Sequence, residues 1–293
     1  MILLSQGLTK HSRLGNSLLM MVRFFNYFKE SGLQLIFPWA QENFTNYLDG
    51  QSNFLKRSES AEEDFHKYFQ QQLNAKNLAS VSRMIEVQFE VEQELEPFKW
   101  ESIKYSLFGD KVLYLSGKLS LTDEKLIESF KNYDLVIIHE PYNYIHQLGE
   151  RYESDLSSIA PSEKLYNAQL RHILSFSNEK KRVGLHIRNG DYKEWSDGQY
   201  FYSEHYWLEA ALKFLNEDYQ VWIFSNDLSV LLKEKLIEVG AIISCENFEV
   251  DFVRLMLMNE IVAPPSTFSS MAYQISSKFY NNEIKLRHLK PNV

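Results

Sequence analysis

The stretch Val183–Tyr192 reads VGLHIRNGDY and passes from an apolar run to a polar turn around Gly190. A short β-branched and apolar run followed by polar residues is typical of a buried strand that ends in a loop. In doubly wound sheets the carboxyl ends of the strands border the ligand crevice. We therefore expect Arg188 to emerge where a ligand binds.

Downstream of this strand, short apolar runs alternate with helical patterns, as in a parallel sheet with crossover helices. We predict strands at Val183–Ile187, Val221–Phe224, Ala241–Ser244 and Ile261–Ala263, and helices from Ser203, around Leu231–Val239, from about Asp251, and from about Phe268 to Phe279. The second helix ends at Gly240, which can adopt the left-handed conformation of a C-cap. Four such repeats predict a doubly wound, Rossmann-like half that binds a nucleotide.

The first half of the chain is less regular but also has an α/β pattern. We predict helices at Asn16–Glu30, Ala61–Leu73, Leu78–Glu86 and near Asp123–Lys131, and strands at Leu33–Phe37, Lys111–Leu115 and Leu135–His139. The segment Glu150–Pro161 is polar and lacks an apolar period, so we place a domain boundary there. The predicted domains are 1–155 and 156–293.

The composition restricts the partners of the protein. The net charge of −8 argues against a broad nucleic-acid surface, which requires clustered Lys and Arg. The one cysteine, Cys245, excludes an internal disulfide and fits a reducing cytoplasm. No stretch is long and apolar enough for a membrane span, so we expect no integral membrane contact. Peripheral contact with a membrane stays open.

The residues after the strand suit an anionic ligand. Arg188 has fixed donors that match a phosphate bidentately, and it keeps its charge at any physiological pH. Asp191 follows at a spacing that lets its carboxylate hold the guanidinium. A strand-end Arg paired with Asp for structure alone is the alternative, and spacing does not separate the two. Asp191, Glu194, Asp197 and His186 are possible general bases, and the sequence ranks none of them.

The motif HIRNGDY (His186–Tyr192) resembles the His-x-Arg-Arg-Gly-Asp-Tyr motif of the α-1,2-fucosyltransferase family, in a superfamily with the α-1,6- and protein O-fucosyltransferases. Further segments resemble that family in order and spacing: Ser12–Asn16 before an apolar helix, Tyr206–Trp207, Phe224–Asp227 and Ser266–Ser270. The resemblance departs at Asn189, where a second arginine is usual, at Ser12 and Ser17 in the opening loop, and at Pro141–Tyr144.

The resemblance implies two Rossmann-like domains facing a cleft, a GT-B-like glycosyltransferase fold. Domain 156–293 would bind a GDP-sugar and domain 1–155 would form the acceptor side. The activity implied is inverting transfer of fucose from GDP-fucose to a saccharide hydroxyl, with no cofactor and no metal. The chain also lacks the Asp-x-Asp and His-x-x-x-His patterns of metal sites.

The resemblance also assigns roles to individual residues. Arg188 would bind the β-phosphate and stabilise the departing GDP, with Asp191 beside it and His186 near the donor. Asp227 would accept hydrogen bonds from guanine; capping of the following helix is the alternative. Two roles remain possible for the residues that begin a later helix, which are Ser266, Thr267, Ser269 and Ser270. They would bind a phosphate or simply cap the helix. Arg13, Gly15 and Asn16 would reach the donor or acceptor, or form an ordinary turn before a helix.

Three functions follow from these observations. The first is a GDP-fucose-dependent transferase acting on a saccharide, with the 2-hydroxyl of a galactoside as a plausible acceptor. The second keeps the scaffold and uses another nucleotide sugar. The third is a protein of the same fold that binds a nucleotide or glycan without turnover, which is supported by the missing second arginine and by the unusual residues of the opening loop.

Overall fold

A computed structural model describes residues 2–5, 14–29, 35–36, 47, 112–115, 124–132, 135–139, 148–149, 153, 155–176, 179–225, 227–244 and 246–291. The chain divides into two compact units. The second unit contains Asp155–Val293 together with Arg13–Leu19 and Asn46–Gly50, and the first contains Met1–Ser12, Met20–Thr45 and Gln51–Ser154. The predicted boundary cuts the chain once, whereas two short N-terminal segments belong to the second unit.

The second unit is built on a parallel sheet in the order β7-β6-β5-β8-β9. Its strands are β5 (Arg182–Ile187), β6 (Gln220–Ser225), β7 (Ile242–Ser244), β8 (Glu260–Ala263) and β9 (Lys285–His288). The strand order reverses between β5 and β8, because the chain runs outward from β5 to β7 and then returns to the other side of β5. The predicted α/β fold class is confirmed, and this order is that of a doubly wound domain.

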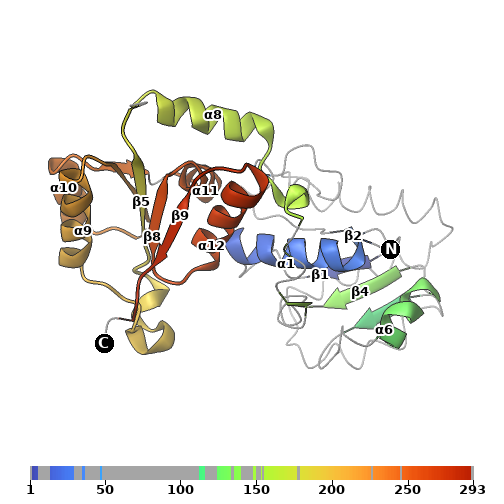
Figure 1. Ribbon diagram of the computed structural model, residues 1–293. Helices are drawn as coiled ribbons and strands as arrows, with labels where there is room; N and C mark the ends of the chain where they lie inside the picture. Colours follow the sequence, from blue (N-terminus) through green and yellow to red (C-terminus); the bar gives the residue numbers. More distant parts are fainter. Residues whose placement is uncertain are drawn as a thin grey trace, which may run out of the picture. The chain divides into compact units, whose positions relative to one another are not determined.

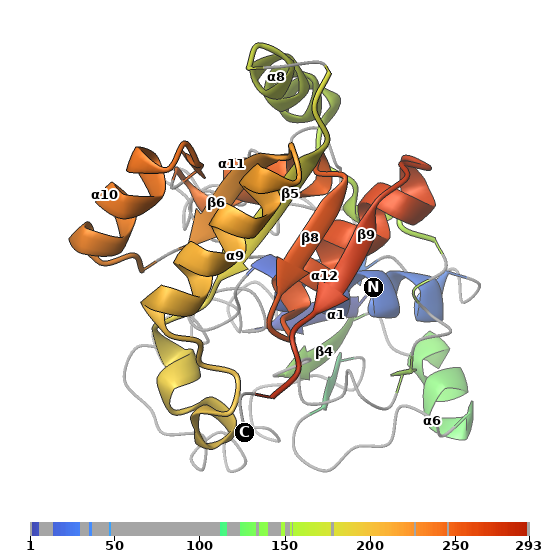
Figure 2. The same ribbon diagram turned by 60° about the vertical axis from the view of Figure 1, so that its left-hand side comes forward.

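Helices cover both faces of this sheet, and Figure 1 shows α9 and α10 on one side with α11 and α12 on the other. The helices are α8 (Glu163–Leu174), α9 (Glu204–Asn216), α10 (Val230–Glu238), α11 (Phe248–Met256) and α12 (Thr267–Gln274), which continues as the π-helical turn η8 (Ile275–Phe279). Figure 2 shows α9 lying along the sheet beside β5 and β6.

The two faces of β5 are distinguished by the alternation of its side chains. Val183, Leu185 and Ile187 join a buried cluster with Trp207 and Phe214 of α9. His186 points to the opposite face, where its ring contacts that of Phe268 of α12. A strand buried on both faces explains why the run reads as continuously apolar.

Helix starts in the second unit are fixed by side-chain caps. Ser203 accepts from the Tyr206 N–H, as the predicted helix start requires. Ser229, Asn247 and Ser266 cap α10, α11 and α12 in the same way. Gly240, with φ of 97°, follows α10 in the left-handed conformation predicted for it.

The first unit also has a parallel sheet, in the order β2-β1-β4-β3. Its described elements are β1 (Ile2–Ser5), the part of α1 (Leu14–Phe28) from Met20 onward, β2 (Leu35–Ile36), β3 (Val112–Leu115), α6 (Glu124–Ser129), η2 (Phe130–Asn132) and β4 (Leu135–His139). The rings of Phe28 and Phe130 stack at 6.1 Å. Arg23 Nε donates to a carboxylate oxygen of Glu153 at 2.9 Å, in a buried ion pair.

Three elements, β1, α8 and β9, were not predicted from the sequence. The predicted helices at Ala61–Leu73 and Leu78–Glu86 lie outside the described residues, as do Arg13 and Pro141–Tyr144. Helix α1 begins two residues earlier than predicted, at Leu14. Gly15 and Asn16 therefore lie inside its first turn, and the interpretation of them as a turn before the helix is wrong.

Candidate functional site

Polar side chains gather where the strand order of the second unit reverses. The carboxyl ends of β5 and β8 lead into Arg188 and into Ser266 at the start of α12, and the neighbouring strand β6 leads toward Asp227. In an open α/β sheet this switch point is where ligands bind, because the two outgoing loops turn away to opposite faces. The sequence prediction of a ligand-facing Arg188 is consistent with this topology.

Arg188 is held at the end of β5 by an ion pair. Its Nη2 donates to both carboxylate oxygens of Asp191, at 2.8 and 3.1 Å. The Arg188 side chain is 10% exposed and that of Asp191 44%. Nε is buried and, like Nη1, makes no hydrogen bond to a described residue. The guanidinium is thus anchored at one edge while most of its donors are uncommitted.

The ring of Tyr192 packs against the guanidinium of Arg188. The Arg188 guanidinium carbon lies 5.1 Å from the centroid of the Tyr192 ring, in a cation–π contact. The Tyr192 hydroxyl donates to the backbone carbonyl of Pro265, before α12. Tyr192 therefore ties the loop after β5 to the loop after β8. Sequence reasoning assigned it no role, although it belongs to the motif.

Asn189 connects the same loop to the other neighbouring strand. Its Nδ2 donates to the backbone carbonyl of Asp227 at 3.0 Å, and the residue is 8% exposed. A buried amide that satisfies a loop carbonyl gives a structural reason for asparagine here. The family that the motif resembles usually has a second arginine at this position. This chain instead has the neutral Asn189, which links the loop after β5 to the loop after β6.

The alternative role of Asp227 as a helix cap is wrong. Ser229 caps α10, with its Oγ accepting from the Leu232 N–H at 3.0 Å. The Asp227 backbone N–H donates to Ser225 Oγ at 3.2 Å. The Asp227 side chain is exposed, and its carboxylate makes no hydrogen bond or ion pair with a described residue. The carboxylate of Asp227 is thus a hydrogen-bond acceptor that does not cap α10.

His186 lies buried beneath this loop. Its ring stands 5.2 Å from that of Phe268, and it is 5% exposed. Its Nδ1 has no hydrogen-bond partner among the described residues. Burial lowers the pKa of His186 to about 4, so the ring is neutral at physiological pH. A neutral, enclosed imidazole suits packing and hydrogen bonding rather than charge attraction.

The serines at the start of α12 divide into two kinds. Ser266 Oγ accepts from the Phe268 N–H at 3.2 Å, which is the capping predicted as the alternative. Ser269 is fully buried and its hydroxyl donates to the Ser266 carbonyl, so it supports the turn. Ser270 is half-buried and its N–H donates to the same carbonyl at 3.0 Å.

The first turn of α1 packs against the first turn of α12. A Cβ at Gly15 would lie 2.4 Å from the backbone nitrogen of Phe268. Glycine is required there because this close backbone approach leaves no room for a side chain. The neighbouring Asn16 Oδ1 accepts a hydrogen bond from the Thr267 hydroxyl. Asn16 thus reaches the predicted site.

The loop between β5 and α9 is built from two short turns, η6 (Asp191–Lys193) and η7 (Trp195–Gly198). Ser196 and Asp197 have φ of 52° and 56°. Left-handed non-glycine residues cost about 1–2 kcal/mol each, so surrounding contacts must hold this loop in shape. The exposed Trp195, which sequence reasoning passed over, packs on Tyr192 and Tyr200.

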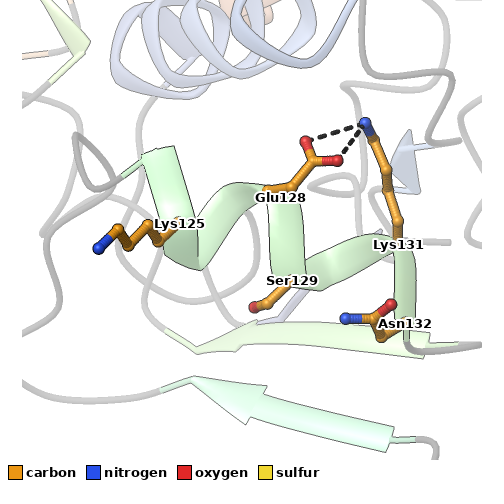
Figure 3. A pocket seen from close by; sticks show the side chains of 5 residues that line it. All are labelled: Lys125, Glu128, Ser129, Lys131 and Asn132. Atoms are coloured by element: carbon orange, nitrogen blue, oxygen red, sulfur yellow. Dashed lines mark hydrogen bonds and ion pairs between the residues drawn. The ribbon is translucent and has the colours of Figure 1, made fainter.

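A hollow of about 690 Å³ lies elsewhere, over α6 of the first unit (Figure 3). Its lining includes Lys125 and Ser129, and the exposed pair Lys131–Glu128 spans 2.9 Å. None of the predicted site residues that the structure describes is among its described lining residues. Across the described ranges, no three His, Cys, Asp or Glu side chains could together hold a metal ion. No described helix has the length and hydrophobicity needed to cross a bilayer.

The similarity of this chain to known proteins is seen in their structures and not in their sequences. No protein-family model and no curated protein matches the sequence. POFUT1 in complex with GDP-fucose is 13% identical with a TM-score of 0.62, over 98% of this chain and 97% of that one. POFUT1 in complex with GDP gives a TM-score of 0.61 at 13% identity and the same coverage.

A glycosyl transferase of family 9 from Veillonella parvula is 11% identical with a TM-score of 0.51, over 94% of this chain and 78% of that one. Likeness at such identity shows the fold. The chain has a GT-B-type α/β fold, like these fucosyltransferase and family 9 structures.

Proposed function

We propose that this chain is a metal-independent glycosyltransferase that transfers fucose from GDP-fucose, with inversion, to a hydroxyl of a saccharide. Residues 156–293 bind the nucleotide sugar, and residues 1–155 contribute to the acceptor side. The observation that supports this most is the position of Arg188. It is a mostly buried cation with uncommitted donors at the switch point of a doubly wound sheet. The fold shared with POFUT1, crystallised with GDP-fucose, supports the choice of donor.

The reaction needs stabilisation of a leaving diphosphate. The acceptor oxygen forms a bond to C1 of fucose as the bond from C1 to the phosphate oxygen breaks, and the bonding electron pair leaves with GDP. The acceptor hydroxyl gives up its proton to solvent or to a nearby side chain that acts as a base. Arg188 binds the β-phosphate and neutralises the charge that grows on it. A cation held in place beforehand by Asp191 and Tyr192 does not have to reorganise during the reaction, which makes its stabilisation effective.

Asp227 supplies the selectivity for guanine. Ser229 caps α10, so the exposed carboxylate of Asp227 is not used as a helix cap. It accepts hydrogen bonds from the guanine N1–H and N2–H₂ groups, which adenine and uracil do not present together. Asn189 fixes the backbone of Asp227 and so positions this acceptor relative to Arg188. The acceptor in this proposal is a galactoside that reacts at its 2-hydroxyl, as the resemblance to α-1,2-fucosyltransferases suggests.

Removal of Arg188 tests the proposal. GDP release from GDP-fucose is measured with a panel of galactosides, with and without EDTA, for the wild type, Arg188→Ala and the control Arg171→Ala, which removes an exposed arginine of α8. Loss of one preorganised donor should lower turnover about a hundredfold or more. Arg171→Ala and EDTA should leave the rate unchanged.

An Arg188→Ala enzyme with near-normal turnover and an intact circular dichroism spectrum would reject the role of this residue. Tight GDP binding by the wild type with no release of GDP from GDP-fucose, across all acceptors, would instead indicate a binding protein on this fold.

A further inference from the structure

An aromatic ladder borders the Arg188 site. We define it as Tyr192, Trp195 and Tyr200, from the turns drawn in yellow next to α9 in Figure 2. The ring of Trp195 stands 4.9 Å from that of Tyr192 and 5.3 Å from that of Tyr200. Trp195 is 44% exposed, although it is among the largest apolar side chains of the chain. Its exposure is unusual because burial of such a ring would stabilise the fold.

The aromatic ladder contacts the proposed phosphate-binding residue, Arg188, through Tyr192. Tyr192 carries the Arg188 guanidinium on its ring and bonds to the carbonyl of Pro265. The backbone next to Trp195 is held in left-handed conformations at Ser196 and Asp197. A Cβ at Gly198, with φ of 73°, would lie 2.9 Å from the Lys193 carbonyl, so this turn closes tightly on itself. A shaped loop thus presents an indole at a fixed place beside Arg188.

We propose that Trp195 is the platform on which a hexopyranose ring of the saccharide acceptor stacks. This inference rests on the proposed transferase function and names a recognition element for its acceptor. One face of such a sugar presents C–H groups of slight positive charge, which complement the negative face of an indole. The exposed carboxylates of Glu194 and Asp197, on either side of Trp195, can accept hydrogen bonds from sugar hydroxyls.

The guanine base is the other flat ligand that an indole attracts, and the connections of the loop argue against it. Asn189 links the loop to Asp227 after β6, whereas Tyr192 links it to Pro265 after β8. β6 and β8 flank β5 on opposite sides. Trp195 packs on Tyr192, so the ladder belongs to the β8 side and the proposed guanine acceptor to the β6 side. Arg188 lies between them.

The test measures sugar binding directly, by saturation-transfer NMR with methyl β-galactopyranoside, and GDP binding separately, by thermal shift. Trp195→Ala should lower the affinity for the glycoside about tenfold, the size expected for loss of one good aromatic contact. Trp195→Phe should restore most of the signal, since it returns a ring. Phe279→Ala, which removes a ring that is 40% exposed at the end of η8, is the matched control and should behave as wild type.

The two measurements separate failure of this inference from failure of the proposed function. Unchanged glycoside binding in Trp195→Ala, or no glycoside signal from the wild type, overturns the platform. Loss of the GDP shift in Trp195→Ala also overturns it, since the indole would then stack on the base. A Trp195-dependent glycoside signal in a protein that GDP does not stabilise upholds the platform and rejects the transferase.

Discussion

In our proposal, Arg188 has both a structural and a functional role. Its ion pair with Asp191 was expected from the spacing, and the pair alone does not exclude a purely structural role. The contact with Tyr192 and the unused Nε point beyond that role, because a structural pair has no need to leave buried donors without partners. A diphosphate would satisfy them.

His186 gives a prediction at the same scale. Burial lowers its pKa to about 4 from 6.5, so between these values the unfolded chain binds a proton that the folded chain does not. Its contribution to stability is intact above pH 6.5 and is lost as the pH falls toward 4. Asp251 acts in the opposite direction, since burial raises its pKa to about 6. A comparison with His186→Gln cancels that second effect.

We expect the wild type to lose about 2 kcal/mol of unfolding free energy relative to His186→Gln between pH 7 and pH 5. Urea unfolding of both proteins at the two pH values measures this difference. Parallel pH profiles would show that the imidazole is not enclosed in solution.

At the scale of elements, the pairing of α1 with α12 gives a second prediction. Gly15→Ala adds a methyl group at a position where the backbone of Phe268 already lies. Alanine normally favours a helix over glycine by about 1 kcal/mol, but overpacking of this kind costs about 1–3 kcal/mol, so we expect net destabilisation. Chemical denaturation measures it. Asn16→Ala, which removes the bond to Thr267 without adding atoms, should cost only about 1 kcal/mol. A stabilised Gly15→Ala protein would contradict this packing.

The elements that sequence patterns predicted are those with many apolar residues. β5, β6 and β8 are buried along most of their length, so their runs were visible. β9 reads Lys-Leu-Arg-His and is mostly exposed at the sheet edge, where backbone pairing with β8 rather than apolar burial forms it. α8 buries only Ile173, so its sequence has little apolar pattern, and it follows the segment Glu150–Pro161 in which the domain boundary was placed.

The candidate site could be predicted from the sequence only in part. The motif pointed to Arg188 and Asp191, whose contact is local. The clamps from Asn189 to Asp227 and from Tyr192 to Pro265 join residues far apart in the chain, which no local pattern reveals. The same holds for the close approach of Gly15 to Phe268.

For the whole molecule, the likeness to POFUT1 extends over 98% of the chain while only 13% of residues are identical. Packing tolerates such divergence provided that volume and pattern are kept, so the fold persists where the sequence signal has faded. The chain carries a net charge of −8, and an anionic donor must therefore be drawn in by a local cation. Arg188 is that cation in our account.

Thermal shift with nucleoside diphosphates tests the central claim most directly. A ligand present at about 100 times its Kd adds roughly 2.7 kcal/mol to the stability of the folded chain, which corresponds to a rise in Tm of roughly 5 °C or more. We predict this rise for GDP, a much smaller one for UDP and ADP, and loss of the GDP preference in Asp227→Asn. Equal stabilisation by GDP and UDP, or none by either, would contradict the assignment of a GDP-sugar site at the end of β5.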